Sequence, residues 1–517
     1  MRLSKHFASY AAMLICVIFA LLYLYISPPT SSPDEIAHLS YPRFLLYEKQ
    51  LPSFQTSQDF WESHQPPLYY FFSTPFVKAF SIFSIENQLQ LDRLASFVLY
   101  LIGLYSFFIL LKKLFPEKQY IQSSAILFLG IPMIGYLAGS FSNDIGMLLI
   151  SIWACYWVFY KSQTNFVHKQ AIFFGIFFGA GLLTKIHVYP ILLVCAIFVL
   201  WKKPFFLWVE ACLSALFISL WWFIHNIQTT GDFFGLSNTF ILWKSQQAPF
   251  AGIHDAFILC GKLFSGFWGV FGKFNIAYPQ VIYAFLVIIS ILLCIYSLKY
   301  FRNAQIKKIF IIIITAIVFV IVQNFTFYQP QGRYLITLAP FIGLLYAFSA
   351  QHANKKFVTP IFIVIIFLIT TLNSLSLLLI HSYYQKNPIA SFTYPRSINL
   401  LQKNFQGDET KIQKVGGVLV IHAPATIYTL QDMRLDTQKK PYIHFTSQNN
   451  DSFTLTIKWK RLGDTTFSNS RSIQSTIHTS GDVKIPEKEK TLIQDIEVEF
   501  TSDHDTITLT EFYVGVN

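Results

Sequence analysis

The sequence has few charged side chains and no framework of cysteines. Charged residues make up 13% of its 517 residues, about half of the roughly 25% that is usual in soluble domains. Its six cysteines stand in or beside apolar stretches, and none lies in the last 200 residues. A disulfide-built outer domain and a zinc site of ordinary cysteine spacing are therefore excluded. Internal repeats and low-complexity segments are missing as well.

Apolar residues dominate instead, at 53% of the chain with a mean hydropathy of +0.46. Long apolar runs that can cross about 30 Å of hydrocarbon, or nearly so, predict transmembrane helices. They lie at 8–27, 94–111, 121–139, 144–160, 170–184, 187–201, 204–224, 280–298, 309–325, 335–350 and 357–379. The fold class they predict is an all-α polytopic membrane bundle of about eleven helices, occupying residues 1–380. Two further runs, 68–85 and 257–274, contain lysines, and we expect them to lie along the membrane surface.

The net charge of +12 does not indicate a nucleic-acid partner, because the basic residues are concentrated at one membrane face. They gather in the short connections near 2–5, 112–118, 161–169, 202–203, 299–308 and 355–356. The positive-inside rule then predicts a multi-pass protein of the plasma membrane, of the bacterial inner-membrane type, with a cytoplasmic N-terminus. No signal-cleavage pattern follows the first run, so we expect that helix to be retained.

The segment 381–517 has a different pattern, with apolar and polar residues in alternation. Phe453, Leu455, Ile457 and Trp459 alternate with threonines and lysines, as in half-buried antiparallel strands. This predicts an extracytoplasmic domain of the β-sandwich type. Two outer segments of the membrane domain, 28–93 and 225–279, are too long for simple connections, and we expect them to carry function.

Charged residues recur at the predicted outer ends of the apolar runs. Asp34, Glu35 and His38 follow the first run, and cations and a further carboxylate stand at later ends, namely Arg93, Asp144, Lys185 and Arg333. Charged residues at the mouth of a membrane bundle indicate a functional site. Cations at one depth would hold the phosphate of a phosphorylated lipid, and a carboxylate would accept a proton or bind a cation.

Short motifs around these residues resemble the GT-C superfamily of glycosyltransferases, which use polyprenyl-phosphate sugars. They are Pro33-Asp34-Glu35-Ile36-Ala37-His38, His64-Gln65-Pro66-Pro67-Leu68-Tyr69-Tyr70, Ser142-Asn143-Asp144, Gly181-Leu182-Leu183-Thr184-Lys185 and Gln331-Gly332-Arg333-Tyr334-Leu335. The branches that look most similar are the protein O-mannosyltransferase and aminoarabinose-transferase type and a poorly characterised group of bacterial membrane proteins. The second is suggested by Trp221-Trp222-Phe223-Ile224-His225-Asn226 with Gly231-Asp232, and by Ser265-Gly266-Phe267-Trp268-Gly269-Val270-Phe271-Gly272.

The resemblance implies an inverting sugar transfer on the outer face. A polyprenyl-phosphate-linked donor would give its sugar to a cell-envelope acceptor, which is a lipid, a glycan or a protein. The acidic residue of the first loop is the proposed base in such enzymes and corresponds to Asp34. Some relatives hold a divalent metal ion there, for which Asp34 and Glu35 would be the ligands. His64-Gln65 departs from the mannosyltransferases, where a charged residue is expected before the prolines.

We therefore predict two sets of site residues. The catalytic set is Asp34 as general base, with Glu35 and His38 supporting it. The substrate-binding set is His64, Gln65, Arg93, Asp144, Lys185, Arg333 and Tyr334. The expected partners are the donor, the acceptor and membrane lipids, without nucleic acid.

Plainer interpretations of these residues stay open. Asp34 could cap a helix, His38 could only orient a neighbour, and His64 could only shape a turn. Asp144 could serve only to interact favourably with the positive end of a helix dipole. Lys185 could extend its side chain along the apolar region so that its ammonium group reaches water. Glu210 is expected to be a packed, partnered acid, and the aromatic residues of 265–274 are expected to be interface anchors. At the level of the whole protein, the alternatives are a transporter or flippase of polyprenyl-linked glycans and a non-catalytic assembly protein that binds glycan through its β-domain.

Overall fold

The structure of the chain is a computed structural model that describes residues 6–52, 62–83, 85–237 and 252–386. Between 397 and 516 it describes all residues except 400–405, 408–410, 416–417, 429–434, 437–440, 449–451, 462–463, 465–466, 488–491 and 503–505. Contacts divide the chain into two compact units. The first is Met1–His38, Glu62–Phe76 and Gln90–Lys386, and the second is Leu39–Trp61, Val77–Leu89 and Asn387–Asn517. The domain boundary at residue 380 stays a prediction.

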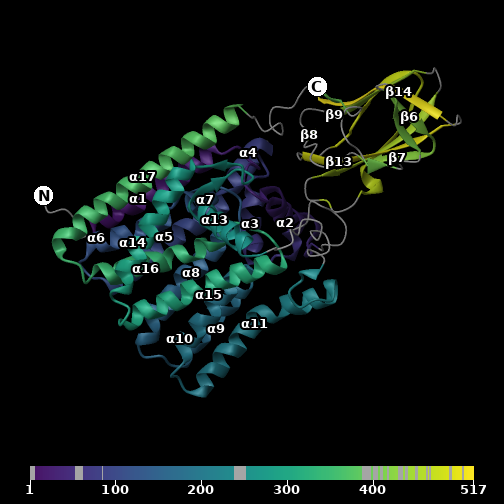
Figure 1. Ribbon diagram of the computed structural model, residues 1–517. Helices are drawn as coiled ribbons and strands as arrows, with labels where there is room; N and C mark the ends of the chain where they lie inside the picture. Colours follow the sequence, from purple (N-terminus) through teal and green to yellow (C-terminus); the bar gives the residue numbers. More distant parts are fainter. Residues whose placement is uncertain are drawn as a thin grey trace. The chain divides into compact units, whose positions relative to one another are not determined.

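The first unit is a helical bundle (Figure 1). Its helices are α1 (Phe7–Ile26), α5 (Leu94–Leu114), α6 (Gln119–Leu127), η2 (Phe128–Gly130), α7 (Pro132–Ala138), α8 (Asp144–Phe159), η3 (Lys161–Gln163), α9 (His168–Leu182), η4 (Ile186–Val188), α10 (Tyr189–Leu200), α11 (Phe205–Thr230), α13 (Ile253–Gly269), α14 (Gln280–Leu298), α15 (Ala304–Thr326), η6 (Gly332–Leu338), α16 (Ala339–Ala350) and α17 (Lys355–Lys386). Three shorter helices, α2 (Glu35–Glu48), α3 (Leu68–Phe80) and α4 (Ile85–Asp92), each contribute residues to both units.

Eight helices of the described residues are long and apolar enough to cross a membrane, or nine if the pair α6–α7, bent by 63°, is one span. The bend falls at Pro132, which cannot continue a helix hydrogen-bond ladder. Each of the eleven predicted runs coincides with a helix or helix pair, so the predicted polytopic bundle is confirmed. The number eleven stays a prediction, because α9 and α10 have only 15 and 12 residues. Neither α3 nor α13 is among the candidate spans, and their expected position along the membrane surface stays a prediction.

Small residues allow the closest contacts in the bundle. A Cβ atom on Gly175 of α9 would lie 2.2 Å from the carbonyl oxygen of Ala211 on α11, and one on Gly179 would lie 2.7 Å from that of Ala215. This spacing of small residues, four apart on both helices, is typical of tight packing between membrane helices. Together with α10, these two helices form one edge of the bundle, and α17 runs beside α1 at another (Figure 1).

The segment after the bundle forms two antiparallel sheets, each of six strands. The first has the order β11 (Ser472–Ile477), β10 (Phe453–Arg461), β13 (Leu492–Thr501), β7 (Ala425–Tyr428) and β4 (Gln406–Gly407), with β8 (Leu435–Asp436) also paired to β13. The second has the order β12 (Ser480–Lys484), β9 (Pro441–Ser447), β14 (Thr506–Val516), β6 (Val418–His422) and β5 (Ile412–Val415), with β3 (Ser397–Asn399) paired to β14.

The two sheets share one apolar core. Alternate residues of β10 are buried, and Leu455 stands opposite Phe500 of β13 in the ladder. Phe445, from the other sheet, brings its ring centroid to 6.2 Å from that of Phe500. The alternation in the sequence therefore does mark half-buried strands, and the predicted β-sandwich is confirmed.

Candidate functional site

The site is built around an ion pair between Asp34 and Arg333, which are 299 residues apart in the sequence. Asp34 is the residue before α2 and has a backbone φ of 57°. This left-handed conformation is uncommon for residues other than glycine, although aspartate adopts it more readily than most. It is of the kind that concentrates at functional sites. The Asp34 side chain is 28% exposed, and that of Arg333 is 3% exposed.

A close approach of α13 to η6 holds Arg333 in place. A Cβ atom on Gly332 would lie 2.1 Å from the carbonyl oxygen of Leu263, so only glycine fits. Gly266 meets Gly332 from the α13 side in the same way. The Arg333 guanidinium lies over the rings of Phe274 and Tyr334, at 5.4 Å and 5.5 Å from their centroids.

Asp144 and Lys185 complete a cluster of alternating charge. Asp144 begins α8, and its Oδ1 accepts a hydrogen bond of 2.7 Å from Lys185 Nζ, while its Oδ2 lies 3.6 Å from Arg333 Nη1. Lys185 Nζ also donates to Asn143 Oδ1 at 2.9 Å. Both side chains of the Asp144–Lys185 pair are buried. Lys185 therefore points into the protein and does not extend along the membrane, so the plainer interpretation of this lysine is wrong.

His38 lies beside this cluster with two partners. Its Nδ1 is 2.8 Å from the Tyr70 hydroxyl oxygen and 3.9 Å from Glu62 Oε2. Among the described residues, His38 Nε2 and Glu62 Oε2 have no hydrogen-bond partner although both atoms are buried. Buried polar atoms without partners are rare in folded proteins. They mark a place where a ligand atom or water would be favoured.

The remaining predicted binding residues line the same region. Gln65 Oε1 accepts a hydrogen bond of 3.5 Å from Asn143 Nδ2, and Gln65 Nε2 lies 3.1 Å from His64 Nε2. The Tyr334 ring stacks on that of His187 at 3.9 Å between centroids and has Lys185 Nζ at 5.5 Å. The structure thus brings together Asp34, His38, His64, Gln65, Asp144, Lys185, Arg333 and Tyr334.

Glu35 and Arg93 are placed differently from what the sequence led us to expect. Arg93 Nε and Nη2 donate to the two Glu35 carboxylate oxygens at 2.7 Å and 2.9 Å, and both side chains are fully buried. Arg93 also donates to the carbonyl oxygens of Ser27 and Pro28, and Glu35 Oε1 accepts from the Phe141 backbone N–H. Neither group has a free face for substrate. We infer that the pair fixes the 27–35 loop; the catalytic role predicted for Glu35 and the substrate-binding role predicted for Arg93 stay predictions, which these contacts do not favour.

Asp34, His38 and Glu62 are groups of the site that lie outside the candidate spans and have shifted pKa values. Burial by itself would raise the pKa of the Asp34 carboxyl, but the Arg333 guanidinium, helped by His38 and Lys185, holds it below its ordinary value. Burial lowers the pKa of His38, against the opposing influence of Glu62. Burial raises the pKa of Glu62, against the opposing influence of His38. A carboxyl with a raised pKa is a stronger base than an ordinary one.

A divalent metal ion does not fit the predicted ligands. The Asp34 carboxylate is bonded to Arg333, and that of Glu35 is bonded in bidentate fashion to Arg93. Hard divalent cations take several oxygen ligands at once. Within the described residues, no group of three histidine, cysteine, aspartate or glutamate side chains is placed to hold one.

Several residues of the site escaped the sequence analysis. Glu62 stands two residues before His64, so its place in the same motif could have drawn attention to it. Nothing in the sequence pointed to Phe274 or His187 as neighbours of the cations. Phe267 and Trp268 are buried, so the expectation that they are interface anchors is wrong. Glu210 pairs with His168, as a partnered acid.

Two crystal structures of ArnT from Cupriavidus metallidurans resemble this structure. The apo state matches with a TM-score of 0.45 over 68% of this chain and 61% of that chain, at 16% identity. The state bound to undecaprenyl phosphate matches with a TM-score of 0.46 over 68% of this chain and 60% of that chain, also at 16% identity. This chain therefore spans less than two thirds of the ArnT length. No family model and no curated protein matches the sequence.

Proposed function

We propose that the chain is a membrane glycosyltransferase of the inner membrane. It would transfer a sugar from a polyprenyl-phosphate donor to a hydroxyl of a cell-envelope acceptor, with inversion at the anomeric carbon. The observation that supports this most is the cluster of Asp34, Arg333, Asp144 and Lys185, because four distant segments place two carboxylates and two cations together. Such a cluster at the end of a membrane bundle is costly without a function.

The cations have the chemistry that a lipid phosphate requires. When the sugar–phosphate bond breaks, negative charge grows on the leaving phosphate, and Arg333 and Lys185 would stabilise it. In the structure both cations are paired with carboxylates. A phosphate that draws Arg333 toward itself would weaken the Asp34–Arg333 pair. The pKa of Asp34 would then rise toward its ordinary value, and its carboxylate would become a better base at the moment when the acceptor attacks.

Two carboxylates are candidates for the base. Asp34 is the more accessible, since its side chain is 28% exposed and that of Glu62 is 10% exposed. Glu62 has the raised pKa and a buried oxygen without a hydrogen-bond partner among the described residues. We assign the base to Asp34, because an acceptor hydroxyl can reach it without displacing buried groups. His38 and Glu62 would then orient the acceptor.

The test is the exchange of each carboxylate for its amide in purified protein. Release of polyprenyl phosphate from a panel of polyprenyl-phosphate sugars would be followed by mass spectrometry, with envelope extract as acceptor. Loss of a positioned base typically slows a reaction by about 10²–10⁴-fold, so Asp34→Asn should lose transfer to that extent and still bind donor. Asp482→Asn, an exposed carboxylate on β12, is the matched control and should keep full activity.

The outcomes separate the alternatives. If Glu62→Gln is inactive while Asp34→Asn is active, the base is Glu62. If both variants transfer sugar at the wild-type rate, this cluster is not catalytic, and the transporter or assembly hypothesis takes its place. Absence of any release by the wild-type protein across the panel would also contradict the proposal.

A further inference from the structure

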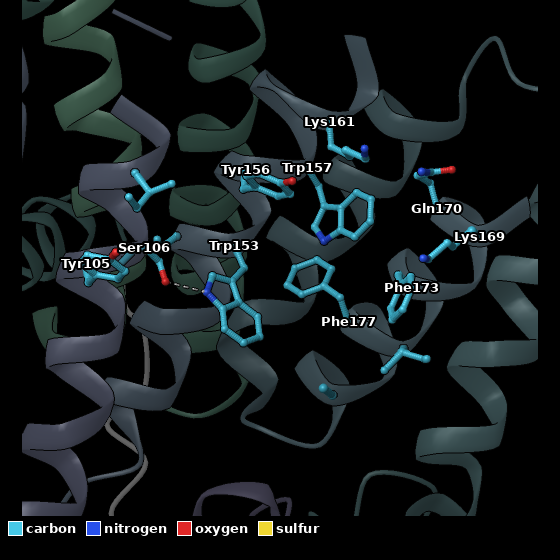
Figure 2. A pocket seen from close by; sticks show the side chains of 14 residues that line it. Tyr105, Ser106, Trp153, Tyr156, Trp157, Lys161, Lys169, Gln170, Phe173 and Phe177 are labelled. Carbon is cyan, nitrogen blue, oxygen red and sulfur yellow. Dashed lines mark hydrogen bonds between the residues drawn. The ribbon is translucent and has the colours of Figure 1, made fainter. Parts of the chain in front are cut away.

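A groove of about 740 Å³ opens between α5, α8 and α9. Its volume falls within the roughly 300–1,000 Å³ of ligand-binding pockets. Aromatic rings form much of the wall, and Lys161, Lys169 and Gln170 gather at one side of them (Figure 2). The rings belong to Tyr105, Trp153, Tyr156, Trp157, Phe173 and Phe177.

The groove is open to the surface of the bundle. Tyr105, Phe173 and Trp153 are 60%, 53% and 38% exposed, whereas Ile152 at its floor is buried. Trp153 Nε1 donates to Ser106 Oγ at 3.3 Å (Figure 2). The indole thus has its polar atom satisfied within the protein, and its ring is left as apolar wall. A hydrocarbon chain could lie against this apolar wall without competing for the Trp153 N–H.

The lysines of the groove lie far from the catalytic cluster. Asp144 begins α8 and Lys161 follows its end, while Lys169 stands at the start of α9 and Lys185 follows its end. The 16 residues of α8 separate the two ends by about 24 Å, most of the roughly 30 Å of hydrocarbon. The groove lysines and the cluster therefore belong to opposite faces of the membrane.

The groove lysines have no counter-ion in the part of the chain that the structure describes. Lys169 Nζ lies 5.9 Å from the centroid of the Phe173 ring, and the acid on the neighbouring helix, Glu210, is bonded to His168. No ion pair joins Lys161 or Lys169 to a described carboxylate. Two uncompensated ammonium groups at the end of an apolar groove are complementary to an anion carried on a hydrocarbon chain.

We propose that this groove binds a phospholipid with an anionic headgroup, taken from the leaflet opposite the catalytic cluster. Its phosphate lies between Lys161 and Lys169, and one acyl chain runs along the aromatic wall toward Tyr105. The site is separate from the one that would hold a polyprenyl-phosphate donor, because the two groups of cations are at opposite ends of α8 and α9. The proposal does not depend on the glycosyltransferase activity.

Native mass spectrometry of the full-length protein in detergent tests the site. The protein would be titrated with phosphatidylglycerol and with phosphatidylcholine of the same acyl chains. An interfacial lysine contributes about 5-fold to the binding of an anionic surface, so Lys161→Gln with Lys169→Gln should weaken phosphatidylglycerol binding by about 25-fold. Phosphatidylcholine should bind the wild-type protein about as weakly as phosphatidylglycerol binds the double variant.

Two further variants distinguish the groove from general attraction. Lys202→Gln removes an exposed lysine between α10 and α11, outside the groove, and should leave lipid binding unchanged. Ile176→Trp fills the groove at an exposed position and should weaken binding while both lysines remain. The proposal is wrong if the double variant binds phosphatidylglycerol like the wild type. Equal weakening by Lys202→Gln, or unchanged binding by Ile176→Trp, would also overturn it.

Discussion

The exchange Glu35→Gln tests whether the acid next to Asp34 is structural or catalytic. Glu35 accepts hydrogen bonds from Arg93 Nε, Arg93 Nη2 and the Phe141 N–H, at 2.7, 2.9 and 2.8 Å. Glutamine keeps the size of the side chain but removes its charge. Arg93, whose side chain is fully buried, would then carry a positive charge without a counter-ion.

The expected cost follows from the burial of the pair. Removing one partner of a buried ion pair typically destabilises a protein by about 3–5 kcal/mol, because the other charge stays desolvated. In domains of roughly 150–250 residues each kcal/mol lowers the melting temperature by about 2–4 °C, and in larger domains by less. Glu35→Gln should therefore lower the apparent melting temperature by several degrees, and by on the order of 10 °C at most. Asp34→Asn should cost less, since the Asp34 side chain is 28% exposed and Arg333 keeps Asp144 at 3.6 Å.

Thermal unfolding of the purified protein in detergent measures both variants side by side. The double variant Glu35→Gln, Arg93→Met removes both charges and should recover much of the lost stability. A different pattern would refute the structural role. If Glu35→Gln melts like the wild type and has lost sugar transfer, then Glu35 belongs to the catalytic machinery as first predicted.

Three other predictions concern the cluster and the topology. Arg333→Lys should weaken donor binding by about 10-fold or more, because a lysine cannot reproduce the bidentate fork, and isothermal titration with a polyprenyl-phosphate sugar would measure it; unchanged affinity would remove Arg333 from the site. Gly332→Ala should destabilise the bundle and reduce transfer together, since its Cβ would lie 2.1 Å from the Leu263 carbonyl oxygen, whereas Gly261→Ala, where a Cβ meets nothing within 4 Å, should be tolerated in the same melting and transfer assays. A reporter fused after Asn517 should be active outside the cytoplasm, and a cytoplasmic reporter would mean that the span count is wrong.

The sequence was sufficient for features that depend on hydropathy alone. Apolar runs such as 280–298 and 357–379 became α14 and part of α17, and the alternation around Leu455 became β10. Hydropathy predicts these elements because the surroundings of each face of a helix or strand determine whether that face carries apolar or polar residues. The expectation that Asp34, Asp144, Lys185 and Arg333 lie close together also came from hydropathy, since each stands at the predicted outer end of an apolar run, and the ion pairs join them in one cluster.

The pairing of charges within the cluster could not be predicted in this way. Glu35 and Asp34 are adjacent in the sequence, yet they bind different arginines on different sides of the loop. The left-handed φ of Asp34 gives the chain the turn that separates their side chains. A pattern of residue types does not contain that dihedral angle. Glu62 was missed for a related reason, because only the folded loop brings it to 3.9 Å from His38.

The burial of the acids decides which of them can meet a substrate. Glu35 and Asp144 are fully buried and each already holds a cation, so an incoming hydroxyl would have to break an ion pair to reach them. Asp34 is the only one of the three whose side chain is partly exposed. Its lowered pKa makes Asp34 a weak base while Arg333 is bound to it. The most accessible carboxylate is therefore a poor proton acceptor until Arg333 moves away. Under the proposed function, a lipid phosphate would draw Arg333 away from Asp34, and donor binding would thereby activate the base for the acceptor in the same cluster.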